Sequence, residues 1–281
     1  MDNLINYNGT VLKSAELILS PDNRGFSFGD GFFESILVIA GSIPLWSYHL
    51  DRIKRSANIL HFNTENIFTD EMLQIELAKI VPVKGIFRVK LSIFRVSSGK
   101  YLPDSNDIQF LIQVFTAKTP MQYAEGHNLS IGRSYKVCNS DAGTWKQVKS
   151  LSALPYVIAS MEAKQAGFED VLILTKSGLI SESTNSNVFV IKGNRIFTPF
   201  IQTGCVNGVF RQYLIQFLSQ KGMEIIENDL FWAEIEKVDE LFLTNAIQWI
   251  RPVTKVPYQY LGENRMTQKI IKMVRQDLLK M

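Results

Sequence analysis

The stretch from Lys149 to Asn187 constrains the fold of this chain more than any other part of the sequence. Its first part has apolar residues at the spacing of one helical face, up to Gly167, a residue type common at helix ends. Two pairs of strand-like runs follow, 170–175 with 179–181 and 187–191 with 195–198, and a turn signal separates each pair. A helix followed by antiparallel hairpins predicts an α+β fold.

The composition is typical of a folded protein with no nucleic-acid, membrane or metal-binding signature. Hydrophobic residues at 46% and charged residues at 20% of 281 allow one large domain or two modest ones. The net charge of +3 and the scattered basic residues argue against a nucleic-acid surface. The N-terminus lacks a signal-peptide pattern, and no apolar run is long enough to cross a bilayer, so we expect a cytoplasmic protein. No metal spacing links Cys138, Cys205, His49, His61 and His127, so we expect no metal site.

The N-terminal half alternates strands and helices. A hairpin turns at Asn8-Gly9, and Ser47 is a plausible N-cap for the first helix. A polar stretch containing Pro120 breaks the periodicity and predicts a linker at 119–126 between domains at 1–118 and 127–281. The predicted elements are a hairpin at 5–12, strands at 33–40, 85–96 and 107–116, and helices at 47–62 and 70–80.

The C-terminal half is richer in strands. Strands are expected at 127–135, 223–227 and 240–244, and amphipathic helices at 209–220 and 267–280. Asn207-Gly208 forms the turn into the first of these helices.

Three isolated features bear on possible chemistry. The glycines of GFSFGDG precede a strand, which fits a tight turn better than a phosphate-binding loop. His49 and Arg52 share one helical face, and a guanidinium there could be solvated or could bind a phosphate. Lys146 and Lys149 share one loop, and either lysine alone is typical of a surface position.

Five motifs in order resemble the fold-type IV pyridoxal-phosphate enzymes, the aminotransferase class IV family, from about Asn23 to about Val253. DNRGFSFGDGFFESI resembles D-R-G-x-x-x-G-D-G-x-F-E-T, and YHLDRIKRSANIL resembles H-x-x-R-L…S-A. VKSLSALPYVIASMEAKQAGFEDVLIL and GLISESTNSNVFVI match the lysine–helix–strand and G-x-x-x-E…S-N-x-F patterns, and GVFRQYLI resembles G-I-x-R. The resemblance implies a two-domain fold like that of D-amino-acid aminotransferases, with a small N-terminal α/β domain and a larger, strand-rich C-terminal α/β domain that anchors pyridoxal 5'-phosphate.

The resemblance also implies roles for two side chains toward the cofactor. Lys149 would bond covalently to it and then move protons, and its offset to Glu162-Ala163 favours it over Lys146. Glu182 would face the pyridine nitrogen and keep it protonated, although an exposed strand glutamate is the ordinary alternative. Family members are usually homodimers, so a homodimer is expected.

The phosphate of the cofactor needs donors and positive charge. Arg52 matches the arginine that binds it in the family, which favours the anion-binding interpretation of that residue. Backbone amides at a helix N-terminus offer a second anion site. The remaining candidates for contact with the cofactor are Gly208, Val209, Phe210, Thr244 and Asn245.

Two stretches bear on the reaction. VNGVFRQYLIQFL and LFLTNAIQWIRPV look most like aminodeoxychorismate lyases, which release pyruvate from 4-amino-4-deoxychorismate to give 4-aminobenzoate for folate biosynthesis. On this interpretation Lys149 removes the C4 proton, and Ser35 or Thr244 assists the leaving group. Alternatives are an aminotransferase for D- or branched-chain amino acids and a non-catalytic binding protein with a relic site.

The substrate of such a lyase carries two carboxylates, so cations are expected near the pocket. Arg95 and Lys100 are the candidates, and Phe33 is a further candidate for substrate binding. Where the family often has R-G-S-G-G-R-G, this chain has RVSSGKY, so Lys100 replaces an arginine and cannot offer a bidentate fork.

Overall fold

The chain forms two compact units in the computed structural model, which describes residues 4–64, 69–124, 129–139 and 144–279. Unit 1 comprises Met1–Lys118 and Val148–Ser152, and unit 2 comprises Thr119–Gln147 and Ala153–Met281. The Lys149 stretch therefore groups with the N-terminal half, although the sequence placed it in the domain at 127–281. Its pairing with a strand of unit 1, described below, is the reason.

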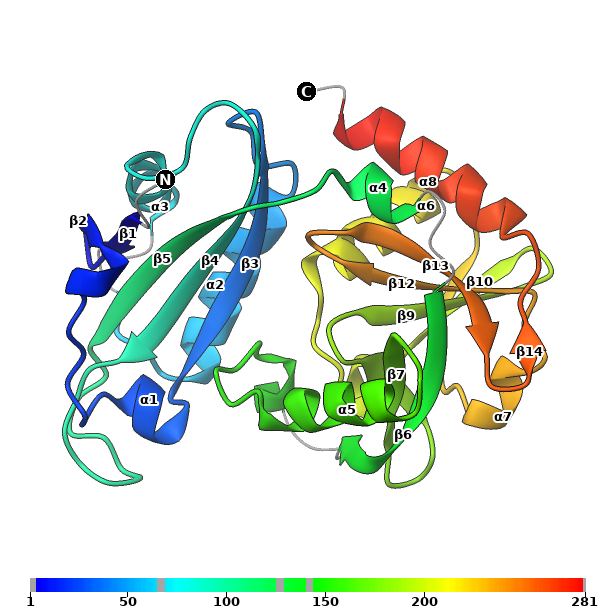
Figure 1. Ribbon diagram of the computed structural model, residues 1–281, viewed down its shortest axis with the longest axis horizontal. Helices are drawn as coiled ribbons and strands as arrows, with labels where there is room; N and C mark the ends of the chain where they lie inside the picture. The colour runs from blue at the N-terminus through cyan, green and yellow to red at the C-terminus, as the bar shows by residue number, and fades with distance from the viewer. Residues whose placement is uncertain (1–3, 65–68, 125–128, 140–143, 280–281) are drawn as a thin grey trace. The chain divides into compact units, whose positions relative to one another are not determined.

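Unit 1 is a five-stranded antiparallel sheet in the order β2-β1-β5-β4-β3. Helix α2 lies against one face of this sheet (Figure 1). Alternate residues of β3 and β4 belong to one apolar core with residues of α2 and α3. Its elements are β1 (Leu4–Tyr7), β2 (Thr10–Lys13), α1 (Arg24–Phe28), β3 (Gly31–Ile39), α2 (Trp46–Ile59), α3 (Asp70–Ala78), β4 (Ile86–Arg95) and β5 (Ile108–Thr116).

Unit 2 is built on a nine-stranded mixed sheet in the order β11-β10-β9-β12-β13-β6-β7-β8, with β14 paired to β13. Helix α5 runs beside β6 and β7, and α6 and α8 pack on β12 (Figure 1). Its elements are α4 (Pro120–Ala124), β6 (Leu129–Asn139), α5 (Leu154–Gln165), β7 (Asp170–Thr175), β8 (Ile180–Ser183), β9 (Asn187–Lys192), β10 (Arg195–Pro199), α6 (Val209–Gln220), β11 (Ile225–Asn228), α7 (Trp232–Ile235), β12 (Glu240–Asn245), β13 (Trp249–Val256), β14 (Gln259–Tyr260) and α8 (Arg265–Leu278).

Most predicted elements are present within a few residues, and the differences have local causes. Ser47 is not an N-cap, because α2 begins at Trp46 with Leu45 before it. Strand β13 was missed because Pro252 lies inside it, and a proline is unusual in a strand with neighbours on both sides. A short helix, α4, occupies part of the predicted linker, whereas residues 125 and 126 and His127 lie outside the described residues.

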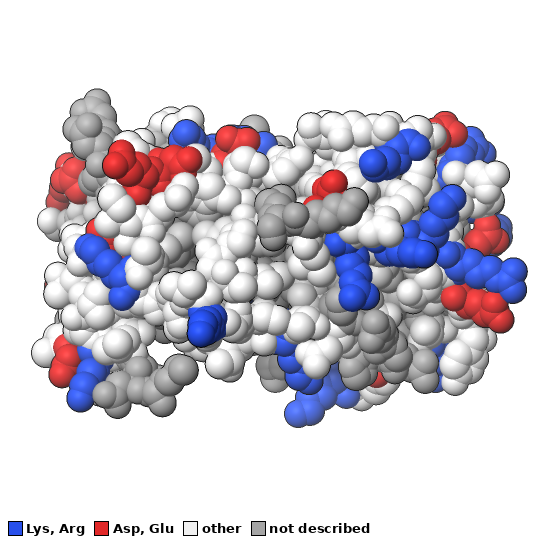
Figure 2. All heavy atoms as spheres, turned by 90° about the horizontal axis from the view of Figure 1, so that it is seen from above, with Lys and Arg blue, Asp and Glu red and all other residues white. Residues whose placement is uncertain are grey.

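The surface of the protein carries charges of both signs (Figure 2). On the face seen in Figure 2, acidic and basic side chains are interspersed with uncharged surface. Among the described residues, no helix combines the length and the apolar character needed to cross a membrane.

Candidate functional site

Lys149 lies in a short stretch that adds to the outer edge of β3. The amide of Phe33 donates a hydrogen bond to the carbonyl oxygen of Lys149 (2.9 Å), and the amide of Leu151 donates to that of Gly31 (3.0 Å). Because β3 is the last strand of its sheet, this edge is open to such pairing. The backbone at Lys149 is thus held by unit 1 independently of its side chain.

The glycines of GFSFGDG make this close approach possible. A Cβ atom at Gly31 would lie 2.4 Å from the carbonyl oxygen of Ile93 and 2.7 Å from Leu151 Cδ1. Gly29 ends α1 in the left-handed conformation (φ 64°), and a Cβ there would lie 2.2 Å from Ser152 Oγ. The motif is therefore a tight turn, and its glycines accommodate the stretch that carries Lys149.

The Lys149 side chain shares its surroundings with a second lysine. Lys149 Nζ lies 4.6 Å from the ring centre of Phe33, and Lys90 Nζ lies 5.3 Å from the same centre. Ser35 is two residues from Phe33, so it is on the same face of β3, and Lys90 is its partner on β4. The sequence analysis missed Lys90, and strand register is the only signal that could have found it.

Arg52 is buried on the opposite face of β3, where it forms a bidentate pair with Glu34. Arg52 Nε and Nη2 donate to the two oxygens of Glu34 at 2.6 Å each, and His49 Nδ1 lies 2.6 Å from Glu34 Oε2. All three side chains are less than a tenth exposed. The pair fixes the orientation of Arg52 and leaves Nη1 as the nitrogen that could reach an anion.

The protonation states of this cluster follow from burial and charge. Burial alone would raise the pKa of Glu34, but the charge of Arg52 and the hydrogen bonds from His49 and Arg52 outweigh it and lower the pKa to about 2. Burial lowers the pKa of His49 below its usual value. The ring is then neutral at pH 7, with its Nδ1–H donating to the carboxylate.

Glu34→Gln is expected to lower the free energy of unfolding by about 3 to 5 kcal/mol, because it leaves the Arg52 charge buried without its counterion. Urea denaturation at pH 7 measures this. The matched control is Glu263→Gln, since Glu263 also pairs with an arginine (2.8 Å) but both side chains are exposed. A loss below about 1 kcal/mol in Glu34→Gln would contradict the predicted contribution of the buried pair.

The same cluster predicts an acid-sensitive fold. Because the pKa of Glu34 falls from 4.5 to about 2 on folding, its stabilisation is complete above pH 4.5 and is lost as the pH falls toward 2. The lowered pKa of His49 acts in the same direction below its usual 6.5. In Glu34→Gln the loss of stability between pH 4.5 and 2 should therefore be smaller than in the wild type, as denaturation across this range would show.

Glu182 is a buried carboxylate of β8, 3% exposed, and not a solvated strand residue. Its Oε1 accepts a hydrogen bond from the Tyr156 hydroxyl (2.7 Å), and its Oε2 accepts one from the amide of Val206 (3.0 Å). Burial, reinforced by the nearby Glu182, raises the pKa of Tyr156, so this hydroxyl keeps its proton. Burial and the same carboxylate raise the pKa of Cys205 to about 12. The buried Glu182 carboxyl group thus accepts hydrogen bonds from two neutral donors.

A chain of contacts connects Glu182 to the N-terminus of α6. The amide of Val206 bonds to Glu182, and the carbonyl oxygen of Val206 accepts a hydrogen bond from Asn187 Nδ2 (2.8 Å). Asn187 Oδ1 lies where a Cβ on Gly208 would approach to 2.1 Å, so only glycine fits before the helix. Thr244 on β12 is the strand partner of Asn187. Within unit 2, Asn187 therefore contacts the Val206 backbone that binds Glu182, lies against Gly208, and pairs with Thr244 on the neighbouring strand.

This part of unit 2 fits an anionic group at the helix N-terminus. Gly208 supplies no side-chain cap, so the first amides of α6, including those of Val209 and Phe210, can bind an external acceptor. Thr244 Oγ1 is buried and, among the residues that the structure describes, has no hydrogen-bond partner. A buried unpaired hydroxyl is costly, and an added phosphate oxygen would satisfy it.

Two other predicted site residues, Asn245 and Arg95, make hydrogen bonds within the protein. Asn245 Oδ1 accepts the amides of Ile247 and Gln248 (3.0 and 2.8 Å), so the side chain closes the turn after β12. The three nitrogens of the Arg95 guanidinium donate to Asp30, Asn106 and the carbonyl oxygen of Leu60. Arg95 is 6% exposed and therefore organises its loop instead of facing a ligand, which corrects its assignment as a substrate contact.

The two remaining candidate lysines are Lys100, which is exposed, and Lys146, which contacts a neighbouring ring. Lys100 is exposed on the loop after β4, as a substrate contact at a pocket mouth would require. Lys146 Nζ lies 4.7 Å from the ring centre of its neighbour Trp145. Within the described residues, no group of three or more histidine, cysteine, aspartate or glutamate side chains could hold a metal ion.

Comparison with known proteins agrees with the motifs. Residues 31–256 match the family described as amino-transferase class IV. The chain is 30% identical over 261 residues to an aminodeoxychorismate lyase of Bacillus subtilis (strain 168), covering 90% of this chain and 86% of the relative. It is 28% identical over 265 residues to a D-alanine aminotransferase of Bacillus licheniformis, covering 91% and 89%.

A solved structure gives the same result for the fold. The structure of a putative 4-amino-4-deoxychorismate lyase of Legionella pneumophila superposes with a TM-score of 0.81 at 27% identity, covering 94% of this chain and 97% of that one. The expected two-domain α+β fold and the expected family are thus confirmed. The chain belongs to the class IV aminotransferase family.

Proposed function

We propose that this protein is a pyridoxal-phosphate-dependent lyase that releases pyruvate from 4-amino-4-deoxychorismate and leaves 4-aminobenzoate. Members of the class IV family are pyridoxal-phosphate enzymes, and a relative that is 30% identical is an aminodeoxychorismate lyase. When bound, the cofactor supplies an electron sink for the substrate. The chain's own residues bind it, orient it and move protons.

Roles toward the cofactor are proposed for residues of each unit, taken separately. Lys149 would bond to its aldehyde carbon, and Glu182 would face its ring nitrogen with an ionised carboxylate. Arg52 Nη1, the first amides of α6 and Thr244 Oγ1 would bind its phosphate. The unpaired Thr244 hydroxyl and the uncapped helix start support this assignment in unit 2.

The observation that carries the proposed reaction is the grouping of Lys149 with Phe33, Ser35 and Lys90 on one face of unit 1. Lys149 Nζ would take the proton from C4 of the substrate, and the Ser35 hydroxyl would donate one to the departing enolpyruvyl oxygen. Lys90 and Lys100 provide positive charge for the two carboxylates of this substrate. Phe33 provides an aromatic surface that both nearby ammonium groups contact.

A second candidate is an aminotransferase for D-amino acids. The D-alanine aminotransferase relative is only slightly less similar than the lyase and covers the chain equally well. Such an enzyme would also need Lys149, Glu182 and the phosphate contacts. It would differ in needing a keto acid as second substrate.

One assay separates the candidates. The purified protein loaded with pyridoxal phosphate is incubated with 4-amino-4-deoxychorismate and no keto acid, and pyruvate and 4-aminobenzoate are measured. Equimolar release of both supports the lyase. Amino-group transfer from D-alanine to 2-oxoglutarate without pyruvate release from aminodeoxychorismate would instead support the aminotransferase. A colourless protein that takes up no pyridoxal phosphate would contradict both and indicate a binding protein.

Tyr156→Phe is expected to weaken pyridoxal-phosphate binding about ten-fold, because the ring remains while a hydrogen bond to a buried carboxylate is lost. Equilibrium dialysis of the apoprotein with the cofactor measures the dissociation constant. Tyr258→Phe is the matched control, since Tyr258 is fully exposed and its hydroxyl has no part in the site. Equal affinities in Tyr156→Phe and the wild type would mean that Tyr156 does not orient Glu182 toward the cofactor.

A further inference from the structure

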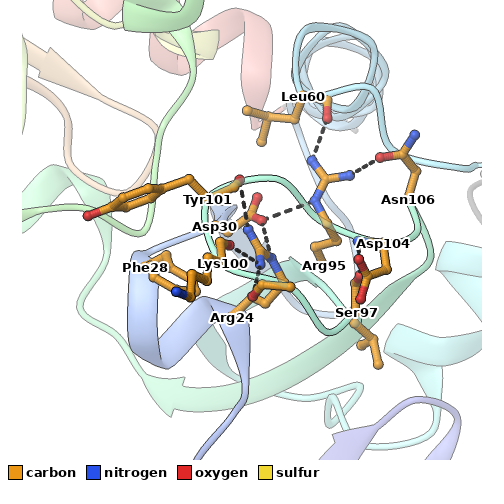
Figure 3. A network of polar contacts seen from close by, with 12 residues as sticks. Arg24, Phe28, Asp30, Leu60, Arg95, Ser97, Lys100, Tyr101, Asp104 and Asn106 are labelled. Atoms are coloured by element: carbon orange, nitrogen blue, oxygen red, sulfur yellow. Dashed lines mark hydrogen bonds and ion pairs between the residues drawn. The ribbon is translucent and has the colours of Figure 1, made fainter.

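A buried ion network in unit 1 joins the loop after β4 to the start of β3 (Figure 3). Asp30 Oδ2 accepts hydrogen bonds from Arg24 Nε (2.8 Å) and from Arg95 Nε (3.0 Å). Both arginines are at least nine-tenths buried. The network has no part in the cofactor and reaction roles proposed above.

Arg24 uses the rest of its guanidinium to hold the main chain of this loop. Its Nη1 donates to the carbonyl oxygens of Gly99 (3.1 Å) and Lys100 (2.6 Å), and its Nη2 donates to that of Tyr101 (3.4 Å) (Figure 3). Since Asp30 can neutralise only one of two arginines, these carbonyl dipoles stabilise the remaining charge. The contacts go to the backbone, so they fix where the loop lies whatever side chains it carries.

The loop is also folded back on itself at its tip, which we define as residues 99–102. Gly99 has φ 93°, and a Cβ there would lie 2.3 Å from the carbonyl oxygen of Leu102. Ser97 Oγ accepts hydrogen bonds from the amides of Asp104 and Ser105 at 2.8 Å each and closes the base. Although its backbone is held, the tip exposes its side chains: Tyr101 is 90% and Leu102 is 83% exposed.

The same network connects the tip to the stretch that carries Lys149. Asp30 precedes Gly31, whose carbonyl oxygen accepts the amide of Leu151, two residues after Lys149. The backbone carbonyl of Asp30 also accepts the amide of Arg95 at the end of β4. Arg24 and Asp30 therefore connect both the tip and the Lys149 stretch to the start of β3 within unit 1.

We propose that Arg24 is a positioning residue for substrate: through Asp30 and the tip carbonyls it fixes Lys100 where its ammonium binds a substrate carboxylate. This inference rests on the proposed lyase function. Lysine lacks the bidentate fork with which arginine would select a carboxylate, so the position of a lysine must be set by its backbone. The three hydrogen bonds from Arg24 to the carbonyl oxygens of the tip set the position of Lys100. Arg24 itself touches neither substrate nor cofactor.

Arg24→Lys tests the proposal, because lysine keeps a charge for Asp30 but cannot reach three carbonyls at once. We expect the KM for aminodeoxychorismate to rise about ten-fold with kcat within about two-fold, since binding is impaired and the chemistry is not. Chymotrypsin should cut the native protein after Tyr101 about ten-fold faster. The visible absorbance of lysine-bound pyridoxal phosphate should match that of the wild type, and the thermal midpoint should fall only slightly, because lysine keeps a charge for Asp30.

A double-mutant cycle shows whether Arg24 acts through Lys100. Lys100→Ala should raise KM to a similar extent, and the double variant should have the KM of Lys100→Ala alone. The matched control is Arg265→Lys, an exposed arginine whose replacement should change neither KM nor cleavage.

Three outcomes would overturn the proposal. The first is an unchanged KM in Arg24→Lys. The second is a double variant in which the KM increases of Arg24→Lys and Lys100→Ala multiply. The third is a loss of both kcat and cofactor absorbance in Arg24→Lys, which marks a general folding defect. Failure of the lyase function is distinct from these, because the wild type itself would then release no pyruvate.

Discussion

Lys149→Ala is expected to abolish the visible absorbance of bound pyridoxal phosphate and to reduce pyruvate release at least about a thousand-fold. The side chain is the proposed covalent attachment point and the proposed base, so one change removes both. The fold should survive, because the Phe33 amide donates to the Lys149 carbonyl oxygen, a backbone contact that alanine keeps. Absorbance spectra and the pyruvate assay on the purified variant measure the two effects.

Lys146→Ala is the matched control for this experiment, since Lys146 lies three residues away and contacts the ring of Trp145. It should retain the absorbance and the activity of the wild type. The opposite pattern, with absorbance kept in Lys149→Ala and lost in Lys146→Ala, would assign the covalent role to Lys146.

Glu182→Gln is expected to lower kcat about a hundred-fold while the fold is retained. Glutamine can keep both contacts, with its oxygen facing the Val206 amide and its NH₂ facing the Tyr156 hydroxyl, which can accept as well as donate. Only the negative charge is lost, and with it the group that keeps the ring nitrogen protonated. Steady-state kinetics at saturating cofactor, together with the thermal midpoint, separate this effect from unfolding.

Glu162→Gln is the matched control, because Glu162 is another buried glutamate of unit 2 and accepts the same two kinds of hydrogen bond. Glu162 accepts one hydroxyl, from Ser134 (2.6 Å), and one backbone amide, from Tyr135 (2.7 Å). Its replacement should lower stability but leave kcat close to the wild type in the loaded enzyme. Similar losses of kcat in both variants would mean that burial of a glutamate, not its position, explains the effect.

Local sequence signals predicted the secondary structure well wherever a residue of a turn or helix end itself favours the conformation required there. Glycines at Gly9, Gly178 and Gly193 occupy the left-handed region, so the hairpins are encoded by single residues. Helix α6 was predicted at its observed limits because Gly208 and an amphipathic repeat mark them. Strand β13 was missed because it contains a proline, which is rare inside a strand but is accommodated in this sheet. The N-cap of α2 was missed because tertiary packing, and not a capping side chain, sets where this helix begins.

The candidate site was only partly visible in the sequence for a different reason. Lys149, Glu182 and Arg52 were proposed because each belongs to a motif, and Thr244 was proposed from its place at the end of a strand. Glu34, Lys90 and Tyr156 were missed because strand register and packing bring them to these residues across 18, 59 and 26 positions respectively. Arg95 was assigned to substrate from its motif, but packing against Asp30 and Leu60 gives it a structural part.

By itself the sequence determined the hairpins, most helices and the family, because these depend on local propensity and on residue order. It also offered candidate side chains for a pyridoxal-phosphate site. Only the tertiary structure decided which charges are neutralised and which groups remain available. It paired Arg52 with Glu34, gave Glu182 two donors, left Thr244 Oγ1 without a partner among the described residues, and placed the Lys149 stretch on β3. The physical reason is that burial and hydrogen bonding depend on neighbours that are distant in the chain, and those neighbours are set by sheet register and packing.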